Sequence, residues 1–194
     1  MSRNATAVAL LGQHAAEHPD EVAHVVVHGT PLTFARWERE SAELAAELVG
    51  RGVAVGEHVG LVFEQAEWCE LAVAYAAVLK AGGIAVPLSH DLVESERADL
   101  LGRLDVRVAL TAADVAGRAS ADAAARAEVE RRSAAVAFDD HAEVTFTSGT
   151  TGTPKAVAST QGTITYHLRT RRRARARYPI AQCAPIGTWA FRRA

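Results

Sequence analysis

The chain has 194 residues, of which 49% are hydrophobic and 23% are charged, and its formal net charge is −2. This length allows one domain with a buried core, and the small net charge gives no overall attraction to nucleic acid or to an anionic membrane.

The longest apolar run, residues 71–79, is too short to span a bilayer. The apolar residues 5–11 lead into polar residues without a cleavage site, which argues against a signal peptide. Cys69 and Cys183 show neither a disulfide nor a metal-site spacing, so we expect a reduced, cytoplasmic setting.

Apolar residues recur along the chain with the period of a helix and then with that of a strand. Thr33 is expected to cap the start of a helix with one apolar face, and Gly50 and Gly52 to end it. A second helical stripe runs over residues 68–79 and is closed by Gly82 and Gly83. Short strands are expected at residues 59–63, 84–87, 106–110, 134–138, 144–146 and 156–158.

The aromatic residues of both stripes have the spacing that packing against a sheet requires, so we expect them in the core. Residues 111–133 are rich in Ala with interspersed charges, which predicts a surface helix and loops. The alternation of strands and helices predicts an α/β fold, with a largely parallel sheet flanked by helices on its faces.

Residues 147–155 form the most informative segment. Glycines permit positive φ and close backbone approach, so successive N–H groups can turn inward onto an anion. Hydroxyl groups add donors and the lysine adds a positive charge. The expected phosphate-binding residues are Thr147, Ser148, Gly149, Thr150, Thr151, Gly152, Thr153 and Lys155. A Walker A loop is a poor match because Pro154 precedes the lysine and Ala156 follows it. The structural alternative is a flexible surface linker.

This loop resembles the Ser/Thr-rich phosphate loop of the adenylate-forming (AMP-binding) superfamily, which includes acyl-CoA synthetases and the adenylation domains of peptide synthetases. Two further segments resemble that family in the same order: Leu32-Thr33-Phe34, and residues 79–88 with the sequence LKAGGIAVPL. The chain has two lysines, Lys80 and Lys155, and both lie in these family-like segments. Members of the family have a large N-terminal domain followed by a small mobile one. The resemblance therefore implies that residues 1–194 are an incomplete N-terminal adenylation domain and that the C-terminal domain is absent.

The resemblance implies ATP-dependent adenylation of a carboxylic acid with release of pyrophosphate, usually followed by transfer of the acyl group to a thiol. The implied partners are a carboxylic-acid substrate and a carrier-protein or CoA thiol acceptor, or a separate chain that supplies the missing half. ATP and Mg²⁺ are the implied cofactors. The family's Mg²⁺-binding Glu, ribose-binding Asp and catalytic Lys would lie beyond this chain, so no catalytic or metal-binding residue is expected in it. The isolated chain is accordingly expected to be inactive.

Two residues depart from the family pattern. Ala156 stands where a glycine commonly follows the lysine, and Gln161 stands where many members carry a histidine. Glutamine donates and accepts hydrogen bonds but carries no proton charge near neutral pH. A contact that relies on an imidazole ring is therefore not expected here.

Two other functions remain open. One is a truncated, non-catalytic remnant that binds a nucleotide or a partner, and the other is an interaction protein that uses the six arginines of residues 169–177. A solvated helix face explains those arginines better than a nucleic-acid contact, because no recognised nucleic-acid motif accompanies them. Ser148 is not in a Gly-x-Ser-x-Gly elbow, so a hydrolase is not indicated.

The histidines could in principle form metal sites. His14 with His18, and His24 with His28, are each spaced four residues apart, but no cysteine or carboxylate cluster joins either pair. Scattered surface histidines are therefore the preferred interpretation.

Residues 182–194 bear on the substrate. By spacing from Lys155, they fall near the place where amino-acid-activating members of the family carry Phe-Asp-x-Ser, whose Asp pairs with an α-ammonium group. No Asp occurs here, and a buried ammonium group without a carboxylate is costly. We therefore expect the intact parent to activate an acid without an α-amino group, or a modified amino acid held differently. Alternatively, a frameshift before this point leaves these residues without information on the substrate.

Overall fold

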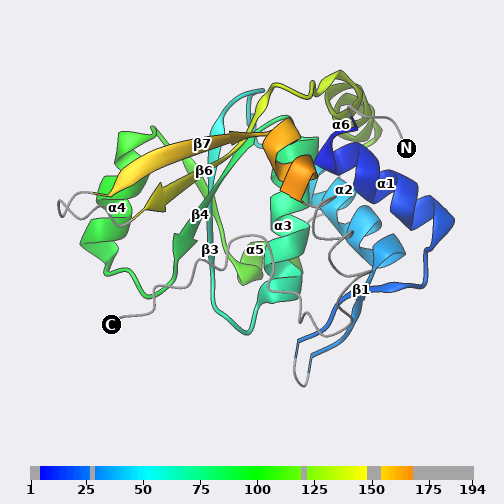
Figure 1. Ribbon diagram of the computed structural model, residues 1–194, viewed down its shortest axis with the longest axis horizontal. Helices are drawn as coiled ribbons and strands as arrows, with labels where there is room; N and C mark the ends of the chain where they lie inside the picture. Colours follow the sequence, from blue (N-terminus) through cyan, green and yellow to red (C-terminus); the bar gives the residue numbers. More distant parts are fainter. Residues whose placement is uncertain (1–4, 27–28, 119–121, 148–153, 168–194) are drawn as a thin grey trace.

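The computed structural model describes residues 5–26, 29–118, 122–147 and 154–167. In these ranges the chain forms a five-stranded sheet with helices on both faces (Figure 1). The strand order is β5-β3-β4-β6-β7, with bounds β3 (His58–Phe63), β4 (Ile84–Ser89), β5 (Val108–Leu110), β6 (His141–Thr147) and β7 (Lys155–Thr160). The pairs β5–β3, β3–β4 and β4–β6 are parallel, whereas β6–β7 is antiparallel. The predicted α/β fold with a largely parallel sheet is thus confirmed.

The helices divide between the two faces of this sheet. Their bounds are α1 (Ala7–Glu17), α2 (Phe34–Gly50), α3 (Trp68–Lys80), α4 (Glu94–Arg103), α5 (Ala112–Ala116) and α6 (Ala123–Ala135). Residues 161–167 are also helical. Successive strand residues point to opposite faces, so Leu61 and Ala85 join a core with α2 and α3, while Val86 packs with Leu100 of α4. A third cluster joins α1 to the start of β6.

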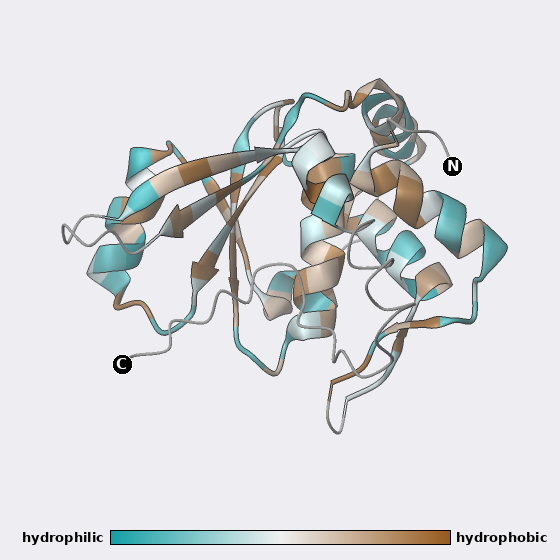
Figure 2. Ribbon diagram, in the orientation of Figure 1, coloured by the Kyte–Doolittle hydropathy of each residue, from teal (hydrophilic) through white to brown (hydrophobic). Residues whose placement is uncertain are grey.

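A short antiparallel ribbon of β1 (Val22–His24) and β2 (Leu32–Thr33) lies beside α2. Figure 2 shows hydrophobic residues along the central strands and hydrophilic residues on the outer turns of α1 and α4. None of the helices in the described ranges combines the length and the apolar character that a membrane crossing needs.

The predicted helix after Thr33 is confirmed. The Thr33 hydroxyl accepts a hydrogen bond from Arg36 N at 3.3 Å, which satisfies one of the free N–H groups at the start of α2. The helix ends at Gly50, and Gly52 follows with φ at +88°, a conformation in which a side chain is strained. The helix predicted over residues 68–79 is also confirmed as α3.

The strand predicted at residues 134–138 is wrong. Helix α6 continues to Ala135, and Val136 ends it. The predicted segment consists mostly of alanine, which favours a helix and shows no real alternation of polar and apolar side chains. Strand β6 begins only at His141, earlier than the predicted residue 144, and extends to Thr147.

Helix α6 is the predicted surface helix of residues 111–133, and Val129 is its buried residue. The guanidinium group of Arg132 in this helix is nevertheless held by hydrogen bonds. Arg132 donates to the carbonyl oxygens of Val53 at 2.7 Å and Ala81 at 3.0 Å. These bonds satisfy carbonyl groups that follow the C-terminal ends of α2 and α3.

Candidate functional site

Strands β6 and β7 form a hairpin, and its described tip is the pair Thr147 and Lys155, at the two ends of the predicted phosphate loop. Thr147 and Lys155 are register partners at the end of this hairpin, and the Thr147 hydroxyl donates to Lys155 O at 3.4 Å. Both residues are exposed. The structure therefore brings together the first and last of the predicted phosphate-binding residues. The residues between them, Ser148, Gly149, Thr150, Thr151, Gly152 and Thr153, lie outside the described ranges.

The hairpin tip lies at the carboxyl edge of the parallel strands. Strand β6 runs parallel to β4, with Ala85 opposite Glu143, and β4 runs parallel to β3, with Ser89 opposite Phe63. The three strands therefore end at the same edge, and Thr147 belongs to it. In open α/β sheets, ligands bind at this edge, so the position of the hairpin tip agrees with a binding role.

Helix α4 supports the hairpin from one face of the sheet. Phe146, the residue before Thr147, packs against the core that contains Leu100 and Val144. The Arg103 guanidinium carbon lies 5.5 Å from the centroid of the Phe146 ring (α4 and β6 in Figure 1). A cation over an aromatic face is attracted to it, so Arg103 holds α4 against the end of β6.

Lys80 lies in a family-like segment, but its ammonium group is buried in the protein. Lys80 Nζ contacts Glu38 Oε1 at 2.7 Å and donates to Glu38 O at 2.9 Å. Burial lowers the pKa of Lys80, and the neighbouring Glu38 carboxylate partly offsets this effect. The lysine therefore joins α3 to α2. The exposed Lys155 is the lysine that can reach a phosphate.

Gln161, the second departure from the family pattern, lies at the opposite end of β7 from Lys155. Its side chain is 2% exposed, and its Oε1 atom accepts a hydrogen bond from Ala7 N at 3.3 Å. The glutamine thus faces the N-terminal helix. The sequence marks this residue as a departure from the family pattern but does not predict its contact with Ala7, which is 154 positions away.

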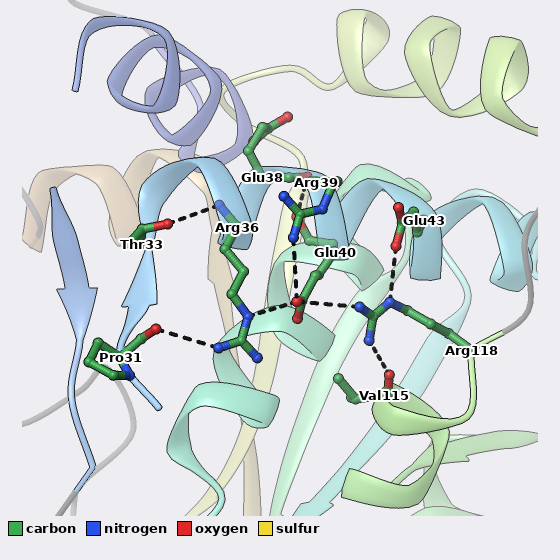
Figure 3. Close-up of polar contacts among 10 residues, drawn as sticks. Pro31, Thr33, Arg36, Glu38, Arg39, Glu40, Glu43, Val115 and Arg118 are labelled. Carbon is green, nitrogen blue, oxygen red and sulfur yellow. Dashed lines mark hydrogen bonds and ion pairs between the residues drawn. The ribbon is translucent and has the colours of Figure 1, made fainter. Parts of the chain in front are cut away.

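A charged network on α2 was not anticipated from the sequence. Glu40 is 7% exposed, and Figure 3 shows its carboxylate between two guanidinium groups. Glu40 Oε1 lies 2.7 Å from Arg36 Nε and 3.4 Å from Arg118 Nη2, and Arg118 Nε donates to Glu43 Oε2 at 3.1 Å. The hydrogen bond to Glu40 raises the pKa of Arg36.

This network joins three segments. Arg36 also donates to Pro31 O at 3.4 Å, before β2, and Arg118 donates to Val115 O at the end of α5 (Figure 3). The Arg36–Glu40 pair has the i,i+4 spacing of a helix and was visible in the sequence. Arg118 was not, because its proximity to Glu40 depends on how α5 packs.

Of the two histidine pairs, His14 with His18 lies wholly within the described ranges. His14 Nε2 lies 3.6 Å from Glu21 Oε2, and its ring packs against those of His18 and Phe34, with centroid separations of 5.0 Å and 4.2 Å. His28 lies outside the described ranges. Across the described residues, no group of three or more His, Cys, Asp or Glu side chains is placed to hold a metal ion. The arginines of residues 169–177, residues 182–194 and Cys183 also lie outside these ranges.

Comparison with known proteins identifies the family. A family model described as AMP-binding enzyme matches residues 11–189. The chain belongs to the AMP-binding enzyme family. The resemblance drawn from the loop and its two companion segments is thereby confirmed.

The chain is similar to bacitracin synthase 1 of Bacillus licheniformis, with 31% identity over 142 residues that make up 73% of this chain and 3% of that protein. Among solved structures, the nonribosomal peptide synthetase FmoA3 is 26% identical with a TM-score of 0.70, covering 89% of this chain and 19% of that one. An AMPPNP-bound form of FmoA3 matches with a TM-score of 0.69.

The N-terminal subdomain of Klebsiella oxytoca NpsA, in complex with 3-hydroxyanthranilyl-AMSN, shares the fold at 22% identity and a TM-score of 0.64. The match covers 80% of this chain and 40% of the NpsA chain. The chain thus spans less than half the length of each of these relatives.

Proposed function

We propose that this chain forms the phosphate-binding part of an adenylate-forming ligase, which activates a carboxylic acid with ATP and releases pyrophosphate. The observation that carries the proposal is the β6–β7 hairpin, which pairs Thr147 with Lys155 at the carboxyl edge of the sheet. Membership of the AMP-binding family supports ATP as the nucleotide. The AMPPNP-bound form of the related FmoA3 also supports this choice.

The chemistry of such a reaction requires the loop to bind negative charge. A carboxylate must attack the α-phosphorus of ATP while the β- and γ-phosphates leave as pyrophosphate, so two anions meet in one site. Fixed donors and cations around the phosphates stabilise this charge. In the proposed site the Thr147 hydroxyl and the Lys155 ammonium group act at the two ends of the loop, and residues 148–153 supply hydroxyl and backbone N–H donors.

Mg²⁺ accompanies ATP in phosphoryl-transfer chemistry in general and would neutralise phosphate charge when bound. The described residues offer no cluster of carboxylates or histidines that fits the ion. We therefore assign no residue of this chain as a Mg²⁺ ligand.

The similarity to bacitracin synthase 1 and FmoA3 supports a carrier-protein thiol as the acceptor of the activated acid. We further propose that turnover requires protein groups outside this chain, since it matches 40% of the NpsA chain. Removing several groups that act together on a transition state lowers rates by orders of magnitude. Pyrophosphate exchange by the purified chain should therefore stay at background with a broad panel of carboxylic acids.

A binding experiment tests the phosphate site directly. Titration of the full chain with pyrophosphate, followed by amide NMR shifts, should move the signals of Gly149, Thr151, Gly152 and Lys155. Lys155→Met should weaken binding about ten- to hundredfold, because a hydrogen bond to a charged group contributes about 1.5–3 kcal/mol and about 1.4 kcal/mol is a factor of ten.

The matched control is Arg131→Met, which also removes one positive charge but from an exposed position on α6. It should leave pyrophosphate affinity unchanged apart from a small long-range effect. Unchanged loop signals at millimolar pyrophosphate, or equal losses of affinity in both variants, would refute the proposed site.

A further inference from the structure

The phosphate-loop hairpin is closed at both ends. At the tip, Thr147 pairs with Lys155. At the base, Gln161 N donates to Asp140 O at 2.9 Å and Gly162 N donates to Phe138 O at 2.8 Å. These bonds join the helix that follows β7 to the segment that leads into β6. The base of the hairpin therefore connects to both strands that carry the loop.

The contact between Gly162 and Phe138 is close. A Cβ atom on Gly162 would lie 2.4 Å from Cε1 of the Phe138 ring, so the helix approaches this segment as only a glycine permits. The next turn is fixed by Thr165, whose hydroxyl donates to Gln161 O at 2.9 Å and which is fully buried. The base of the hairpin is thus a tightly packed unit.

Helix α1 attaches to this base. A helix begins with N–H groups that have no partner within it. Thr6 accepts from Ala9 N at 3.3 Å, whereas the N–H of Ala7, the first residue of α1, donates to Gln161 Oε1. Val8 then packs with Ala142 of β6 and Ile164 of the helix after β7. The N-terminus of α1 therefore contacts both sides of the hairpin base.

To bind the Ala7 N–H at 3.3 Å, the side chain at position 161 needs an acceptor atom and no positive charge. The amide oxygen of glutamine does so at any pH. A protonated imidazole has only donors and would face the positive end of α1. The glutamine thus suits an anchor for a helix start.

We infer that Gln161 is a positioning residue, which fastens the start of α1 to the base of the β6–β7 hairpin and so holds in place the two strands that carry the phosphate loop. The part of this inference that concerns phosphate binding rests on the proposed function of the loop. The attachment of α1 to the hairpin base does not, and it can be tested separately.

Two single substitutions remove the hydrogen bond between Ala7 N and Gln161 Oε1, one at the acceptor and one at the donor. Gln161→Met keeps the length of the side chain but removes the acceptor. Ala7→Pro removes the donor, and proline is well tolerated at the first position of a helix. Thr6, with φ −75° and ψ 166°, already has the extended conformation that a residue before proline prefers.

Amide hydrogen exchange on the full chain gives the first measurement. Each single substitution should speed exchange in α1 and at the base of β6 and β7 by about tenfold, because each leaves one partner of this partly buried hydrogen bond unpaired. The double variant Ala7→Pro/Gln161→Met leaves neither group unpaired, so its effect should be smaller than the sum of the two. Gln161→Glu, which retains an acceptor, should restore part of the protection.

The control is Gln13→Met on the same helix, where the glutamine is bonded only to the exposed Glu17. It should leave exchange at the hairpin base unchanged. Unchanged protection of α1 in Gln161→Met, or faster exchange in α1 alone with the hairpin unaffected, would overturn the inference. A Gln161→Met chain that fails to fold supports it only if adding Ala7→Pro restores folding, and failure of that rescue contradicts it.

Pyrophosphate titration gives the second measurement. Gln161→Met should weaken binding several-fold although Thr147 and Lys155 are intact, and Gln161→Glu should recover part of the affinity. Full affinity in Gln161→Met would contradict the link to the loop. If the parent chain itself binds no pyrophosphate, the proposed function fails, and the exchange data still decide whether Gln161 fastens α1.

Discussion

Tyr75 of α3 places its phenol beside the buried carboxylate of Glu143, which lies on β6 of the hairpin. Glu143 is 7% exposed, and neither Tyr75 Oη nor Glu143 Oε2 has a well-formed hydrogen bond within the described part of the chain. Burial raises the pKa of Glu143, and the Tyr75 hydroxyl offsets part of this effect. Burial also raises the pKa of Tyr75 well above its ordinary value, and the charge of Glu143 adds to that.

The stability of the chain should therefore depend on the protonation of Glu143. Its pKa in the folded protein lies above the ordinary value of 4.5, so the folded state favours the protonated form. The resulting stabilisation is fully present below pH 4.5 and is lost as the pH rises through the folded-state pKa. Glu143→Gln, which stays neutral, should gain stability relative to the parent as the pH rises from 4 to 7.

Urea unfolding at several pH values measures this difference. Glu64→Gln, which replaces an exposed carboxylate after β3, is the control. A stability difference for Glu143→Gln that does not change with pH would show that the buried carboxylate does not titrate differently in the folded chain.

The two lysines should separate stability from ligand binding. Lys80→Met removes the buried partner of Glu38 and should cost about 3 kcal/mol of unfolding free energy, as expected for breaking a buried ion pair. Lys155→Met is exposed and should change stability by less than about 0.5 kcal/mol while weakening pyrophosphate binding. Denaturant midpoints together with pyrophosphate titrations test both halves of this prediction. A stable Lys80→Met chain would contradict the structural role of that lysine.

Gly82 should not tolerate a side chain. It has φ at +79°, and an added Cβ would lie 3.2 Å from Val55 Cγ2, so Gly82→Ala should destabilise by about 1–2 kcal/mol. Gly102, inside α4, has open space at the Cβ position, and Gly102→Ala should stabilise by about 0.5–1 kcal/mol. Thermal unfolding of the two variants should therefore shift in opposite directions.

The Glu40 network should contribute more to stability than its outer ion pair. Glu40→Gln leaves Arg36 and Arg118 without their shared carboxylate and should cost about 3 kcal/mol. Glu43→Gln removes only the more exposed contact with Arg118 and should cost less than about 1 kcal/mol. Chemical denaturation at low and high salt distinguishes the two, since salt screens the exposed pair more strongly. Equal costs for both variants would contradict a network centred on Glu40.

The sequence predicts those features that depend on neighbouring residues. Thr33 as a cap, the end of α2 near Gly50 and Gly52, and the glycines that close α3 before β4 follow from local backbone chemistry, and the structure confirms them. The order of strands and helices follows from apolar periodicity in the same way. The prediction of a strand at residues 134–138 was wrong because a run of alanines gives little periodic signal. The high helix propensity of alanine indicates a helix there instead.

The features that the sequence does not predict depend on residues far apart in the chain. Glu40 and Arg118 approach one another only because the fold brings the segment after α5 next to α2, and Gln161 meets Ala7 across 154 positions. The burial of Lys80 beneath α2 is of the same kind. Of the candidate site, the two strands at residues 144–146 and 156–158 follow from their apolar residues. Their antiparallel pairing into a hairpin and the fastening of its base do not.

Strand β7 has a consequence for handling the protein. Within the described ranges it is the last strand of the sheet, and Lys155, Ala156, Val157 and Ala158 are all exposed. A strand of this kind with a single terminal charge and no proline is a template for a strand of another molecule. The colloidal behaviour of a concentrated solution should therefore be governed by the six residues that lead away from the phosphate loop. A charge placed at Ala158 should keep such solutions monodisperse without altering the loop itself.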